Sequence, residues 1–153
     1  MIKIVEGNIL NANDDLICHQ VNCKGVMGAG LAKQIRNKYP IVFEKYRKLC
    51  NSQEGKLLGA TQYIETSDGK VIVNMFAQDG YGRDRRHTDY EALEQCLNSI
   101  KYTVSDNNTA LNGKTVAFPY QIGCGLAGGN WSIVYNMISD IFQDSHVTLY
   151  KLQ

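Results

Sequence analysis

A local pattern that occurs twice limits the possible folds of this chain more than any other part of its sequence. Residues 16–38 and residues 115–142 each contain a mostly apolar run, then a glycine-rich segment, then a stretch with the apolar spacing of an amphipathic helix. The glycine-rich segments cover residues 25–30 and 123–129. We therefore expect two strand–glycine loop–helix units, which are typical of an α/β fold.

Two such loops have a chemical consequence if they lie side by side. Glycine lets the backbone approach a ligand closely, and the first turn of the following helix points N–H groups and a positive dipole end at that ligand. Ligands of α/β sheets bind at the carboxyl ends of the strands. The pattern therefore predicts one cleft for an extended anion such as a diphosphate. The alternative interpretation is that both loops are tight turns in which glycine serves packing alone.

The remaining pattern predicts a three-layer α/β/α sandwich around a mixed sheet of about six strands. Asp68-Gly69 joins two of these strands and is a hairpin signal, so part of the sheet is expected to be antiparallel. The predicted strands are 2–5, 16–21, 58–65, 71–77, 115–120 and 146–152, and the predicted helices are 31–38, 41–50, 89–104 and 131–142.

Length and composition set the expectations for compartment and partners. The length of 153 residues favours a single domain over residues 1–153. The net charge of +1 argues against non-specific binding of nucleic acid. The five cysteines form no CxxC pair and match no zinc spacing, so we expect no metal site and reduced thiols, as in a cytoplasmic protein. No secretory signal and no apolar run of about 18 residues is present, so no membrane segment is expected. We expect a monomer.

Residues 123–128 read GCGLAG and match the GxGxxG motif of dinucleotide-binding domains. That motif normally precedes several further strand–helix units, whereas here only one predicted strand follows it. A nicotinamide-dependent oxidoreductase is therefore disfavoured. The GxxxxGK[ST] motif of P-loop nucleotide triphosphatases does not occur.

Three segments resemble the ligand-binding segments of macrodomains and follow the same order along the chain. They are EGNI at 6–9, HQVNCKGVMGAGLA at 19–32 and PYQIGCGL at 119–126. The likeness is greatest to the branch that holds the terminal ADP-ribose–glutamate hydrolases and the yeast-type ADP-ribose-1″-phosphate phosphatase. It implies the macrodomain fold and binding of ADP-ribose or an ADP-ribosylated macromolecule. It implies no cofactor, and nucleic acid is expected as a partner only where it is the modified substrate.

The resemblance also implies ligand contacts. Asn8 and Ile9 would lie beside the adenine, where the family usually has Asp in place of Asn8, and Asn22 would contact the distal ribose. Gly28, Gly30 and Leu31 would border the distal ribose and diphosphate, and the backbone N–H groups of Ile122, Gly123, Cys124, Gly125 and Leu126 would surround the diphosphate.

Two positions depart from the glutamate-linkage hydrolases. Those enzymes use a Lys at the end of the strand that corresponds to 71–77 and an Asp just after GCGL, where this chain has Gln78 and Ala127. Because Gln cannot form a Schiff base, a mechanism with a Lys nucleophile is not expected. The phosphatase-like members carry a His at the position of His19, which this chain keeps.

The candidate catalytic residues are His19, Asn22 and Asp79. His19 can transfer a proton near neutral pH, and Asp79 can activate a water at the exit of a strand. The simpler interpretations are a core histidine and a carboxylate in the turn 79–82. Tyr81 in that turn can cover the distal ribose, and Gln78 is expected among the ligand contacts.

We therefore expect a hydrolase that acts at the distal ribose of an ADP-ribose derivative. The substrate would be an ADP-ribosylated protein, an O-acyl-ADP-ribose or ADP-ribose-1″-phosphate. A module that binds ADP-ribose without catalysis is the alternative, because it needs the cleft but no acid or base.

Overall fold

The computed structural model describes residues 1–53 and 55–152; residues 54 and 153, which the single-domain prediction includes, lie outside the described residues. The described residues form a six-stranded sheet in the order β1-β6-β5-β2-β4-β3. The strands are β1 (Ile2–Glu6), β2 (Leu16–Val21), β3 (Thr61–Glu65), β4 (Val71–Phe76), β5 (Val116–Pro119) and β6 (Val147–Lys151). The helices are α1 (Gly30–Lys38), α2 (Pro40–Ser52), α3 (Tyr90–Ser105) and α4 (Trp131–Ile141), with a short 3₁₀ helix η1 (Ile9–Asn11).

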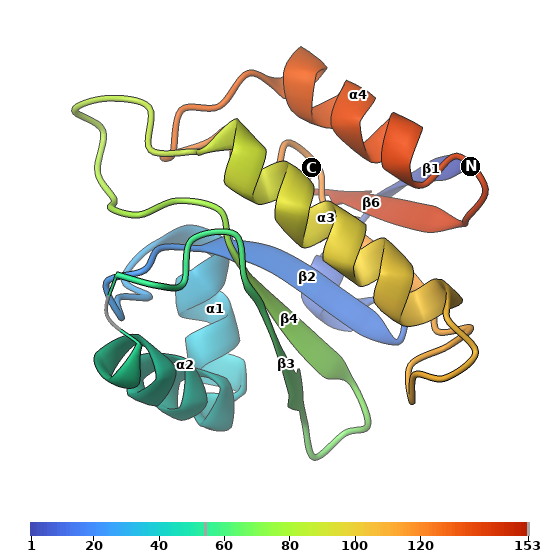
Figure 1. Cartoon of the computed structure of the whole chain (residues 1–153), viewed down its shortest axis with the longest axis horizontal. Helices are drawn as coiled ribbons and strands as arrows, with labels where there is room; N and C mark the ends of the chain where they lie inside the picture. The colour runs from blue at the N-terminus through green and yellow to red at the C-terminus, as the bar shows by residue number, and fades with distance from the viewer. Residues whose placement is uncertain (54, 153) are drawn as a thin grey trace.

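Helices cover both faces of the sheet. Helices α1 and α2 pack on one face, and α3 and α4 pack on the other (Figure 1). Side chains alternate between the two faces along β2: Leu16 and Cys18 join the core under α3 and α4, whereas Ile17 and Val21 join the core under α1 and α2. This arrangement confirms the predicted three-layer α/β/α sandwich.

The sheet is mixed, as the sequence predicts. β3 runs antiparallel to β4, and the other neighbouring strands run parallel. Gly69, in the turn between β3 and β4, has a φ of +84°, which suits glycine and confirms the hairpin. β3 begins at Thr61 rather than at residue 58, and η1 has no counterpart in the sequence pattern. No helix among the described residues has the length and apolar character that crossing a membrane requires.

β2 and β5 separate toward their carboxyl ends. Their ladder covers the pairs Leu16–Val116 and Ile17–Ala117, whereas β2 and β4 pair along all six residues of each strand. The connection after β2 runs through α1 and α2 on one face, and the connection after β5 runs through α4 on the other. Strands that diverge at such a switch point leave a crevice at the carboxyl edge of the sheet.

Candidate functional site

A cleft of about 710 Å³ occupies this crevice, and both glycine loops line it. The two loops therefore lie side by side at one edge of the sheet, as the repeated pattern predicts. Most of the predicted site residues line the cleft: His19, Asn22, Gly28, Gly30, Leu31, Gln78, Tyr81, Ile122, Gly123, Gly125 and Leu126. Ala127, the position at which the resemblance to the glutamate-linkage hydrolases would lead us to expect Asp, also lines it.

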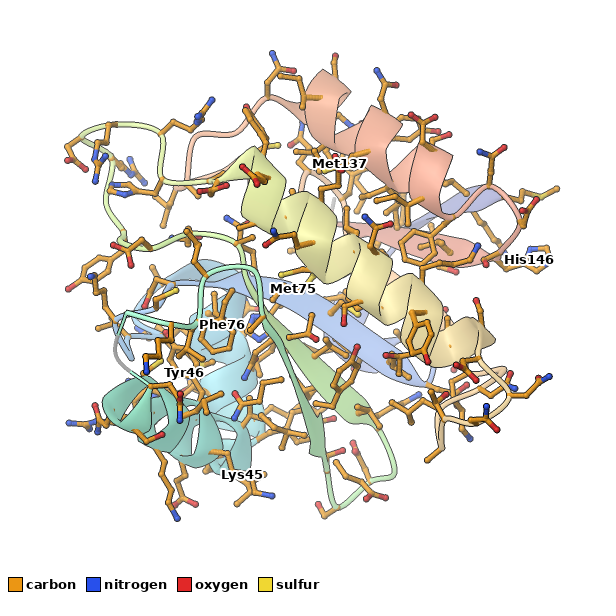
Figure 2. All side chains as sticks on the ribbon, in the orientation of Figure 1. Lys45, Tyr46, Met75, Phe76, Met137 and His146 are labelled. Carbon is orange, nitrogen blue, oxygen red and sulfur yellow. The ribbon has the colours of Figure 1, made fainter. Side chains whose placement is uncertain are left out.

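The first glycine loop is held by Asn22 and Tyr46. The Asn22 amide donates to the Val26 carbonyl at 2.8 Å, and its Oδ1 accepts from the Lys24 N–H at 3.0 Å. The Tyr46 hydroxyl, on α2, lies 2.7 Å from both the Asn22 carbonyl and Oδ1. Figure 2 shows Tyr46 beside Phe76 of β4, on which its ring stacks at 5.8 Å. Asn22 thus lies at the cleft but uses its amide to shape the loop.

Helix α1 begins at the cleft without a side-chain cap. Its N-cap residue is Ala29, and Gly30, Leu31 and Ala32 of the first turn line the cleft. The first N–H groups of a helix have no partner within the helix, and they carry the positive end of its dipole. By contrast, α3 and α4 begin at capping side chains, Asp89 and Asn130. The start of α1 is therefore suited to an anionic ligand.

The second glycine loop offers further unpaired donors. Within the described residues, the N–H groups of Gly123, Gly125, Leu126 and Ala127 have no hydrogen-bond acceptor. The loop reverses sharply: the Gly129 N–H donates to the Gly123 carbonyl at 2.8 Å. Successive N–H groups in such a turn form a concave site for an anion without a positively charged side chain.

Polar side chains on the α3 side of the sheet fix the position of that loop. The Thr88 hydroxyl donates to the Gly123 carbonyl at 2.6 Å, and the Gln20 amide donates to Thr88 and to Gln78, both at 2.9 Å. Gly123 has a φ of +75°, and a Cβ there would lie 2.7 Å from Gln20 Oε1. The left-handed φ therefore favours glycine at position 123, and a Cβ there would also displace the Gln20 amide.

His19 lies at the floor of the cleft and is 1% exposed. Burial lowers its pKa to about 4, a shift that the hydrogen bond to Asn74 opposes. The imidazole is therefore neutral at pH 7. Within the described residues, the buried side-chain polar atoms without a hydrogen-bond partner are His19 Nδ1 and Gln20 Oε1, and both residues line the cleft.

Four predicted residues are not among those that line the cleft. Asp79 forms an ion pair with Lys24 at 3.2 Å and borders a separate hollow beside Arg86 and His87. Asn8, whose Oδ1 accepts from the Leu10 N–H at 2.9 Å, caps η1. The other two are Cys124 and Ile9, which is the buried first residue of η1.

Few ionisable side chains line the cleft. Among the described lining residues they are His19, Tyr81, Arg83 and Tyr120, and none is a carboxylate. Burial raises the pKa of the Cys23 and Cys124 thiols to about 11, so neither is a thiolate near neutral pH. Within the described residues, no group of three or more His, Cys, Asp or Glu is placed to hold a metal ion.

The sequence pattern did not single out Gln20, Thr88 or Asn74. Asn74 interrupts the otherwise apolar strand VIVNMF, and the structure shows it fully buried. Because buried amides need hydrogen-bond partners, an Asn in such a strand could have indicated a buried polar contact. Gln20 and Thr88 carry no comparable signal, since their neighbours come from distant segments.

The structure is that of an α/β protein with one cleft between two glycine loops, whose unpaired N–H groups suit an extended anion. The family model for the Macro domain matches residues 18–138, and the chain belongs to this family.

Two of the curated relatives have names that give different activities. The DNA ADP-ribosyl glycohydrolase of Mycobacterium tuberculosis is 29% identical over 145 residues, which are 94% of this chain. The chain spans only 39% of that relative's length. The ADP-ribose 1″-phosphate phosphatase of Saccharomyces cerevisiae is 23% identical, and the match covers 99% of this chain and 98% of the phosphatase.

A solved structure of a relative has the same fold. The macrodomain of Mycobacterium tuberculosis DarG superposes with a TM-score of 0.81 at 26% identity, covering 98% of this chain and 97% of that one.

Proposed function

We propose that this protein binds ADP-ribose in the cleft and hydrolyses a bond at the distal ribose of an ADP-ribose derivative. The observation that carries the proposal is the pair of glycine loops with unpaired N–H groups on one cleft. A diphosphate supplies several oxygen acceptors at the spacing of such loops, and neutral backbone donors suit a chain of net charge +1.

The hydrolysis is proposed to proceed without a covalent intermediate. Gln78 lines the cleft and cannot act as a Lys nucleophile, and the described lining residues include no carboxylate. Burial lowers the pKa of His19 to about 4, so its ring stays neutral and can accept a hydrogen bond from the attacking water, which the bound diphosphate can also help to orient. The names of the relatives support DNA-linked ADP-ribose or ADP-ribose-1″-phosphate as substrate.

Calorimetric titration with ADP-ribose tests the binding step. We expect saturable one-to-one binding, and weaker binding of ADP and of ribose-5-phosphate, each of which fills part of the cleft. No binding of ADP-ribose would overturn the proposal. Sedimentation of the same sample would test the expected monomer, and a fluorescent fusion would test the expected cytoplasmic location.

A substrate panel tests the chemistry. It contains ADP-ribosylated DNA, a peptide with ADP-ribose on glutamate, O-acetyl-ADP-ribose and ADP-ribose-1″-phosphate. Release of product from at least one of them is expected. Tight ADP-ribose binding without turnover of any would instead favour a non-catalytic reader, the second candidate, which the absence of a lining carboxylate in the described cleft also supports.

A further inference from the structure

A row of polar side chains crosses three neighbouring strands beneath the cleft. Asn74 of β4 is fully buried, and its register partners are His19 on β2 and Gln62 on β3. Residues that share a register position lie on the same face of a sheet, here the face that α1 and α2 cover. The row begins at the cleft with His19 and ends at the Lys45 carbonyl of α2.

The hydrogen bonds in this row have a single possible direction. The carbonyl of Lys45 can only accept, so Gln62 must donate to it through Nε2, at 3.2 Å. Gln62 therefore presents Oε1 to Asn74, whose Nδ2 donates to it at 3.0 Å. Asn74 is left with Oδ1 toward His19, and the Nε2–Oδ1 distance is 2.5 Å. An oxygen acceptor at that distance requires the hydrogen of His19 to be on Nε2.

This direction determines the state of the other ring nitrogen. A neutral imidazole carries one hydrogen, so a hydrogen on Nε2 leaves Nδ1 with a free lone pair. Nδ1 is buried and has no hydrogen-bond partner among the described residues, and His19 lines the cleft. Burial keeps the pKa of His19 well below neutral, so the ring stays in this neutral form at pH 7.

We propose that Asn74 is a positioning residue that holds His19 as the Nε2–H tautomer, so that Nδ1 accepts a hydrogen bond from a hydroxyl or water at the distal ribose. The proposal rests on the proposed function, because it places the ribose end of the ligand over His19. The opposite tautomer would present an N–H to the ligand and could not accept a proton from water.

Nitrogen-15 spectroscopy of the histidine rings tests the tautomer directly. The chain has three histidines, and the spectrum of H19Q identifies the signals of His19. At pH 7 we expect Nε2 to be protonated and Nδ1 to be unprotonated. In N74L the two signals should move toward the mixture of tautomers that a free imidazole shows. M75L is the matched control, because Met75 is the next residue on β4 and faces the opposite side of the sheet.

Adding ADP-ribose tests whether Nδ1 meets the ligand. The Nδ1 signal should shift on saturation in the unaltered protein and in M75L. If the unaltered protein shows a protonated Nδ1, or if Nδ1 does not respond to bound ADP-ribose, the inference is wrong. If ADP-ribose does not bind at all, the proposed function fails, and the tautomer assignment is still decided by the spectrum of the free protein.

Kinetics separate positioning from a merely structural role. On the substrate that turns over, N74L should lower kcat by about tenfold or more with KM nearly unchanged, since a positioned proton acceptor acts mainly in the transition state. In the H19Q background, N74L should cause little further loss, because both changes remove the same acceptor. N74D should retain the Nε2–H tautomer, since a carboxylate also accepts from Nε2. Equal and additive losses in both backgrounds would show that Asn74 serves folding alone.

Discussion

Single residues in the second glycine loop have separable roles. Gly123 serves the conformation of the loop: its φ is +75°, and a Cβ at this position would lie close to Gln20 Oε1. Gly125 lies two residues further, its φ is outside the left-handed region, and a Cβ there would meet no heavy atom within 4 Å. Because Gly125 also lines the cleft, this position is predicted to serve the ligand rather than the fold.

G125E should abolish ADP-ribose binding and leave the fold intact. The glutamate side chain would fill the space for the diphosphate and repel it, so a loss of affinity of about 100-fold or more is expected, with a change in the free energy of unfolding within about 0.5 kcal/mol. Calorimetric titration and urea unfolding measure the two effects. G125A is the control for the backbone change, and unchanged affinity in G125E would refute the assignment of this loop.

G123A should lower the stability of the protein, whereas G125E should lower its affinity for ADP-ribose. An L residue at a left-handed φ costs about 1–2 kcal/mol, and the new methyl group would displace the Gln20 amide. Urea unfolding should therefore show a clear loss of stability. A variant as stable as the unaltered protein would mean that the loop can adopt another conformation.

At the scale of elements, α1 differs from the helices on the other face. It begins at Ala29 in an extended conformation that suits a capping residue, yet no side chain caps it. Helices α3 and α4, which begin away from the cleft, are capped by Asp89 and Asn130. Helix α2 also lacks a side-chain cap and begins at Pro40, so the feature that sets α1 apart is that its first turn lines the cleft, where a ligand can occupy its N–H groups.

A29D should make the protein more stable and a poorer binder. A capping carboxylate at this position is expected to stabilise α1 by about 1 kcal/mol. It would also occupy the free N–H groups and repel the diphosphate, so the affinity for ADP-ribose should fall by about tenfold or more. Thermal unfolding and calorimetry measure the two changes. A29S, which caps without a charge, should lose less affinity; an A29D protein that binds as well as the unaltered one would exclude α1 from the site.

For the whole molecule, the buried His19 links stability to pH. Its pKa is about 4 in the folded protein and about 6.5 in an unfolded chain. The unfolded state therefore binds the proton more tightly, and this contribution to stability is complete above about pH 6.5 and is lost as the pH falls toward 4. Protonation at low pH would place an imidazolium beside the apolar core under α1 and α2.

Urea unfolding at pH 7 and pH 4.5 tests this linkage. The unaltered protein should lose on the order of 2 kcal/mol more than H19Q between the two pH values, because the variant lacks the titrating ring. Other groups contribute equally to both proteins and cancel in the comparison. If the two proteins lose the same amount, His19 is not held neutral by burial.

Much of the fold was predictable from the sequence, whereas less of the site was. The six strands, the four helices and the hairpin at Gly69 follow from apolar spacing and turn residues that lie within a few positions of each other. The start of β3 and the 3₁₀ helix η1 were missed, because they depend on pairing with β4 and on capping by Asn8. The position of both glycine loops on one cleft was predicted, because parallel strands expose their carboxyl ends at one edge.

The sequence by itself determined the elements, the layered sheet and the two glycine loops, since periodicity and backbone freedom are local properties of a chain. Only the tertiary structure decided which polar groups serve the cleft. Asp79 pairs with Lys24 outside it, and Asn74 meets His19 across the strands. These outcomes depend on strand register and on packing between segments far apart in the chain, which no local pattern encodes.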